Sequence, residues 1–134
     1  MEKVFEIYIK TTPERLWEAI VDGPVKLLLP PGYEGGPPEA EGENVEVDPP
    51  RRLVQTMLAK WSEEVEREGR SRITYEIEPV GTSCRLTVTH DQLREGANDE
   101  LYGGWPMILS ALKTKLETGE ALDTPASLRF AASV

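Results

Sequence analysis

The 134-residue sequence predicts a single α+β domain in which a curved antiparallel sheet wraps around one long C-terminal helix. Several segments alternate apolar and polar residues with period two, the pattern of strands with one buried face. Two other segments repeat apolar residues at helical spacing, a short one near the N-terminus and a longer one near the C-terminus. Runs of strands followed by a helix indicate the α+β class, and the C-terminal helix is the only large element that we expect to cover the sheet.

Residues 2–10 predict the first strand, with three apolar side chains on one face: Phe5, Ile7 and Ile9. A short helix follows. Thr12 is a suitable N-cap, and Pro13 is favoured at the first helical position because its missing N–H has no partner there in any case. Gly23 and the proline after it end this helix.

Glycine and proline crowd the next part of the chain. Residues 23–50 contain 5 of the 11 glycines and 7 of the 11 prolines. Proline removes donors from a strand ladder and glycine weakens strands, so residues 30–42 predict a surface loop or a lid.

Four further strands are expected, at residues 43–47, 51–64, 71–79 and 82–91. Turn residues separate them, which favours an antiparallel meander with one apolar face. The second of these strands places five side chains on that face: Leu53, Gln55, Met57, Ala59 and Trp61.

The strongest helical pattern lies in residues 101–122. Its apolar positions recur at helical spacing: Trp105, Ile108, Leu109, Leu112 and Leu116. Gly119 is a plausible C-terminal cap. The tail at 121–134 has no clear period. We therefore expect one domain over residues 1–134.

The net charge argues against several classes of partner, and the cysteine content indicates the redox setting. The formal net charge is −9, with 24 acidic and 15 basic residues, which argues against nucleic acid or an anionic membrane. The single cysteine, Cys84, rules out an intramolecular disulfide and favours a reducing, cytoplasmic setting. No apolar run approaches the roughly 18 residues that a membrane-spanning helix needs, and residues 1–10 do not resemble a signal peptide.

Five motifs in this order resemble one family: TTPERLWEAI, VEVDPPRRLV, SRITYEIEPVG, CRLTVTH and YGGWPMILSALKTKLETG. They are similar to the START-like (SRPBCC, helix-grip) superfamily, in the AHSA-like branch named after the activator of the heat-shock-protein ATPase. The resemblance covers about residues 3–120. It implies a curved sheet gripping a C-terminal helix, with a cavity between them that takes apolar or aromatic small molecules in many relatives. Members usually have a longer segment, often with an extra strand, where this chain has the loop at 30–42.

The sequence therefore predicts a ligand-binding domain that holds a small hydrophobic or aromatic molecule, or a lipid, between sheet and helix. Three side chains would supply polar contacts: His90, Tyr75 and Gln55. Five would form the walls: Met57, Trp61, Trp105, Ile108 and Leu112. The same residues also suit an ordinary filled core, and His90 equally suits a strand-end histidine that is bonded to a nearby loop.

Two other functions stay open. The first is a protein-interaction module with a chaperone-associated role in the stress response, as the family name suggests. The second, a cyclase- or hydrolase-like enzyme, ranks last, because Glu76, Glu78 and Asp91 have the strand parity of solvent-facing residues. Cys84 and His90 share a face but lie about 20 Å apart along one strand, too far to share a metal. No motif implies a cofactor.

Overall fold

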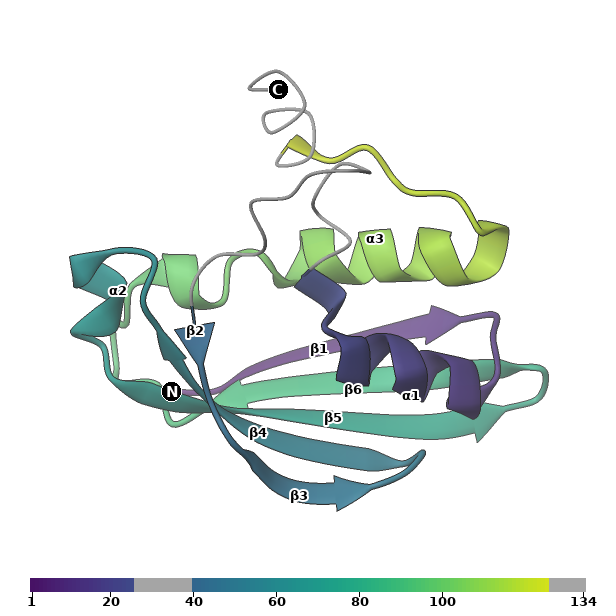
Figure 1. Cartoon of the computed structure of the whole chain (residues 1–134), viewed down its shortest axis with the longest axis horizontal. Coiled ribbons are helices and arrows are strands. Elements are labelled where there is room, and N and C mark those ends of the chain that lie inside the picture. The colour runs from purple at the N-terminus through teal and green to yellow at the C-terminus, as the bar shows by residue number, and fades with distance from the viewer. Residues whose placement is uncertain (26–39, 126–134) are drawn as a thin grey trace.

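The computed structural model describes residues 1–25 and 40–125, which form a curved antiparallel sheet with helices against its inner face (Figure 1). The elements in chain order are β1 (Lys3–Ile9), α1 (Pro13–Asp22), β2 (Ala40–Glu41), β3 (Asn44–Asp48), β4 (Arg52–Ala59), α2 (Glu63–Glu66), β5 (Arg70–Val80), β6 (Ser83–Asp91), a 3₁₀ helix (Asp99–Leu101) and α3 (Trp105–Thr118). The predicted α+β class and its long C-terminal helix are confirmed.

The six-stranded sheet has the order β1-β6-β5-β4-β2, and β3 also pairs with β4. Neighbouring strands β4, β5 and β6 form the expected meander. The chain's first strand, β1, completes the sheet beside its last strand, β6, with Lys3 opposite His90 and Ile9 opposite Cys84.

The register builds the core on one face of the sheet. One row runs across four strands from Phe5 through Val88 and Tyr75 to Leu53. Because side chains alternate along a strand, this row and its neighbours point to the same side. They join one buried apolar cluster that includes Leu112 of α3.

Both helices cover the inner face, which corrects the expectation that the C-terminal helix covers it alone. The helix α1 packs on β5 while α3 packs mainly on β1. The Thr12 side chain caps α1 by accepting a hydrogen bond from the Arg15 N–H at 3.2 Å. Two α1 residues, Leu16 and Ile20, are buried in the main core. At the end of α3, Gly119 has the left-handed φ of 78° that glycine adopts without strain.

The strand predicted over residues 51–64 is too long. β4 ends at Ala59, and α2 begins after Ser62, whose hydroxyl accepts a hydrogen bond from the Val65 N–H at 3.3 Å. Val65 is fully buried in a second small cluster, and this burial together with the cap turns the chain away from the sheet. Trp61 therefore lies beyond the strand that was expected to carry it, with 38% of its surface exposed.

The loop predicted over residues 30–42 also differs at its end. Ala40 and Glu41 form a short strand that pairs with Ala59 and Leu58 of β4. Gly42 follows, where a Cβ atom would overlap the carbonyl oxygen of the facing β4 strand. Here glycine permits a close approach of two backbones rather than a loose loop. The remainder of that loop lies in 26–39, and the end of the tail in 126–134, outside the described residues.

Candidate functional site

Three of the predicted cavity residues, His90, Tyr75 and Trp105, pack against one another on the inner face. His90 is fully buried, and Tyr75 and Trp105 are each 5% exposed. The Trp105 ring stands edge-on to both, with ring centroids 6.0 Å from Tyr75 and 6.3 Å from His90. Leu112 belongs to the same cluster. These contacts have the edge-to-face geometry that aromatic rings prefer.

His90 has both ring nitrogens bonded inside the protein. The Trp105 indole N–H donates to Nδ1 at 3.2 Å, and Nε2 lies 2.7 Å from the Ser71 hydroxyl. An indole N–H only donates, so Nδ1 accepts, and the neutral ring carries its proton on Nε2 and donates it to Ser71. Burial lowers the pKa of His90 to about 4, although Asp91 opposes this shift.

This arrangement has a direct chemical consequence. A serine whose oxygen accepts from histidine is not activated as a nucleophile, because activation requires the histidine to take the serine proton. The histidine also has no free nitrogen for a ligand in this state. The partners lie on a strand and a helix, not on the nearby loop that the sequence suggested, and they satisfy both ring nitrogens within the fold.

The other predicted site residues are spread more widely. Ile108 is buried in the main core with Trp105. Gln55 and Met57 lie on the inner face of β4, towards the edge of the sheet that is farther from β1, and both are only half-buried. The Gln55 amide donates a hydrogen bond to the Asn44 side chain at 2.9 Å. The structure therefore brings together the β5, β6 and α3 members of the predicted set, with Met57 packed against their cluster, and leaves Gln55 and Trp61 apart.

The sequence also singled out Cys84, which is fully buried. Its thiol donates to the Thr11 carbonyl at 3.3 Å, and burial raises its pKa. A buried thiol that keeps its proton is a poor nucleophile. Among residues 1–25 and 40–125, no group of three potential metal ligands lies close enough to hold an ion, and no helix there could cross a bilayer.

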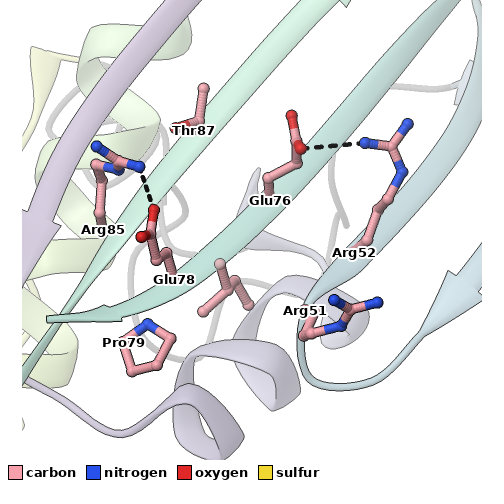
Figure 2. Close-up of a pocket in the computed structure, with 8 residues that line it drawn as sticks. Arg51, Arg52, Glu76, Glu78, Pro79, Arg85 and Thr87 are labelled. Atoms are coloured by element: carbon pink, nitrogen blue, oxygen red, sulfur yellow. Dashed lines mark hydrogen bonds and ion pairs between the residues drawn. The ribbon is translucent and has the colours of Figure 1, made fainter.

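An open pocket lies on the outer face of the sheet, with a volume of about 460 Å³ (Figure 2). It forms where β4 begins and β5 continues past it. Eight residues line it: Arg51, Arg52, Glu76, Ile77, Glu78, Pro79, Arg85 and Thr87. None of them is among the predicted cavity residues.

Ion pairs across the strands organise this pocket. Arg52 on β4 pairs with Glu76 on β5 at 3.1 Å, and Arg85 on β6 pairs with Glu78 on β5. Figure 2 shows the two glutamates in the middle, each turned to an arginine on the neighbouring strand. Arg51, in the turn before β4, bonds to Asp48, which raises the pKa of its guanidinium. All these side chains stay substantially exposed, so their pairs are open to exchange with a partner.

Sequence reasoning placed Glu76 and Glu78 on the solvent side correctly but did not see this pocket. The parity of Arg52 and Arg85 was the available signal, since both lie on the same side as the glutamates. The pairing itself depends on register, which parity alone does not supply.

A second hollow of about 540 Å³ lies between α2 and the loop after β6. Its main feature is a bidentate pair in which Arg94 donates to Glu68 at 2.7 and 2.8 Å. The Asn98 backbone N–H also donates to Glu68, at 3.1 Å. The hydrogen bonds from Arg94 lower the pKa of Glu68. The Glu68 carboxylate already accepts these three hydrogen bonds, so we interpret the ion pair as a structural link between two loops.

Residues 11–117 match the family model described as Activator of Hsp90 ATPase homolog 1-like protein. The chain belongs to this family. Within it, the helix-grip fold is shared with solved structures of low sequence identity. An Aha1 dimer from Colwellia psychrerythraea is 19% identical, with a TM-score of 0.67 over 90% of this chain and 98% of that chain.

Two further similar structures widen the comparison. A Mesorhizobium loti protein is 23% identical, with a TM-score of 0.69 over 90% of this chain and 99% of that one. An Hsp90 activator from Plasmodium falciparum is 17% identical, with a TM-score of 0.65 over 89% and 96%. At these sequence identities, the structural similarity shows that this chain shares the fold of these proteins, and it shows nothing about their function in this chain. No curated protein matches the chain.

Proposed function

We propose that this chain is a protein-binding module that docks on an Hsp90-class chaperone through the outer face of its sheet. One observation carries the proposal: the pocket with a charged lining opens on the outer face, while three of the side chains expected to line an inner cavity, Trp105, His90 and Tyr75, pack against one another. An accessible surface whose charged side chains are already ordered by ion pairs suits a macromolecular partner.

The chemistry of the outer pocket supports this function. Arginine is enriched at protein interfaces because its planar guanidinium can donate two hydrogen bonds to one carboxylate and remains charged when it is buried. Three arginines border this pocket, and each is paired with a carboxylate on the same surface. Such a surface suits a partner with alternating charges, which would replace these pairs with pairs of its own. The family description and the Plasmodium falciparum relative support a chaperone ATPase as that partner.

The test measures the ATPase rate of a purified Hsp90 with and without this protein. The wild-type chain is expected to bind and change the rate, and the double variant Arg52→Gln/Arg85→Gln is expected to lose most of that effect. Arg15→Gln is the matched control, because it removes an exposed arginine from α1, on the other side of the sheet. Equal activity of both variants, or no binding by the wild type, contradicts the proposal.

A small-molecule site is a second proposal, favoured by the half-buried state of Gln55 and Met57 on the inner face. An apolar or aromatic ligand would lie at this end of the face, near Trp61. An environment-sensitive apolar dye should then shift the Met57 methyl resonance, and Met57→Trp should weaken dye binding by filling the space. Leu58→Trp, one residue along the same strand, is the control. If the affinity for the dye is the same in Met57→Trp as in the wild type, this site is ruled out.

A further inference from the structure

The free edge of β1 is a surface that neither proposed function uses. β1 pairs with β6 over its whole length and, within the described residues, pairs with no other strand. An edge strand presents unpaired backbone N–H and C=O groups, which can template another strand. Natural proteins usually block such edges, so the extent of blocking is informative.

In the part of the chain that the structure describes, the blocking contacts lie at one end of β1. Lys113 of α3 donates to the Tyr8 carbonyl at 2.8 Å, and the Lys10 N–H donates to Glu117 of α3, also at 2.8 Å. Lys113 and Glu117 are themselves paired at 2.7 Å. This salt-bridged pair closes the C-terminal end of the edge, where β1 leads into α1.

Within residues 1–25 and 40–125, no equivalent hydrogen bond covers the other end. The bond to the Tyr8 carbonyl shows which residues face the edge, because an antiparallel strand turns the N–H and C=O of alternate residues to the same side. Val4 and Glu6 therefore also present their backbone groups to the free edge. On α3, helical spacing places Ser110 and Pro106 in line with Lys113. Both are exposed and short, and the Ser110 hydroxyl is bonded to the Pro106 carbonyl.

Side chains beside the open edge define what fits it. Val4 and Tyr8 are 55% and 51% exposed on the outer face, and the exposed Glu6 carboxylate lies between them. Cross-strand neighbours stabilise a sheet when apolar side chains face each other and opposite charges pair. The complementary strand carries a cation opposite Glu6 and apolar side chains two residues to either side.

A second copy of this chain does not meet that requirement. Antiparallel self-pairing centred on Glu6 sets two carboxylates opposite each other, and pairing centred on Phe5 sets Glu6 opposite Val4. Neither register provides a cation. The net charge of −9 also opposes association of two copies and attracts a basic segment.

We propose that the open edge from Val4 to Glu6 binds an extended basic segment of a partner protein by strand addition, with an apolar–x–Lys/Arg–x–apolar pattern. Backbone hydrogen bonds to Val4 and Glu6 hold the segment, and the side-chain pattern selects it. This inference does not depend on the identity of the chaperone or on the outer pocket.

The probe is the peptide acetyl-Thr-Val-Thr-Lys-Thr-Val-Thr-amide, titrated into the full chain and followed by amide NMR. We expect shifts at Val4 and Glu6, and binding about three- to tenfold weaker when glutamate replaces the peptide lysine. Glu6→Lys should reverse this preference. Glu18→Lys on α1 is the matched control with the same change in net charge, and it should keep the preference for the lysine peptide.

Val4→Pro removes an edge N–H and should abolish binding, and Glu6→Lys keeps the proposal testable if that variant does not fold. Shifts confined to other strands, or equal binding of both peptides by the wild type, would overturn the proposal. A dimer in analytical ultracentrifugation that Glu6→Lys dissociates would overturn it too, since the occupant of the edge would then be a second copy.

Discussion

The two faces of this sheet are built from alternate residues of the same strands, yet they have opposite properties. On β5, Tyr75 and Ile77 are buried beneath the helices, while Glu76 and Glu78, which alternate with them, stand in solvent and pair with arginines of the neighbouring strands. The inner face is mainly apolar, and both ring nitrogens of the buried His90 are bonded inside the protein. We infer that the inner face supplies stability and the outer face is available for recognition.

Core truncation should give the largest effect. Leu112 is 1% exposed within the cluster that joins α3 to the sheet. Leu112→Ala should lower the free energy of unfolding by about 2–5 kcal/mol, through lost burial and a cavity. Urea unfolding measures it. Val47→Ala, at an exposed valine on β3, is the control and should change the free energy by less than about 0.5 kcal/mol. Similar losses in both variants would contradict the division between buried and exposed positions.

The pH dependence of stability tests the burial of His90. Its pKa in the folded state is about 4, and in the unfolded chain it is about 6.5. The unfolded state therefore takes up a proton first, so stability falls as pH drops through this interval. Between pH 7 and pH 5 this residue should remove about 2 kcal/mol from the free energy of unfolding. The slope in that range should largely vanish in His90→Gln, and an unchanged slope would show that His90 does not titrate this way.

Removing the hydrogen-bond partner of His90 should have a similar or smaller effect. Ser71→Ala leaves the Nε2 proton without an acceptor in a buried site, at a cost of about 1–3 kcal/mol in the free energy of unfolding. Thermal or urea unfolding at pH 7 measures it. Thr89→Ala, on the outer side of β6 beside His90, is the control. A Ser71→Ala protein as stable as the wild type would mean that water or another group accepts this proton.

The smallest effect on stability is expected on the outer face. Arg85→Gln breaks the pair with Glu78, but both side chains are largely exposed, so urea unfolding should show little change. Its effect should appear instead in chaperone binding, as a faster dissociation or a weaker affinity by surface plasmon resonance. A large loss of stability in this variant would show that the ion pair belongs to the scaffold.

Much of the architecture could be predicted from local pattern. Period-two alternation located β1, β5 and β6, the cap at Thr12 marked the start of α1, and Gly119 marked the end of α3. These signals work because they depend on neighbours a few residues apart along the chain. They failed after Ala59, where alternation continues in the sequence but Ser62 and the burial of Val65 start a helix.

The partners of the polar side chains could not be predicted in this way. Parity placed His90 on the inner face, but its bonds to Ser71 and Trp105 join residues 19 and 15 positions away on different elements. The expected ligand cavity stays a prediction for the same reason. How far side chains fill the space between helix and sheet depends on where α1 and α3 settle, and that is decided by the packing of the whole core. The sequence alone establishes which side chains share a face. Register and helix packing, which sum many weak contacts between distant segments, decide which of them meet.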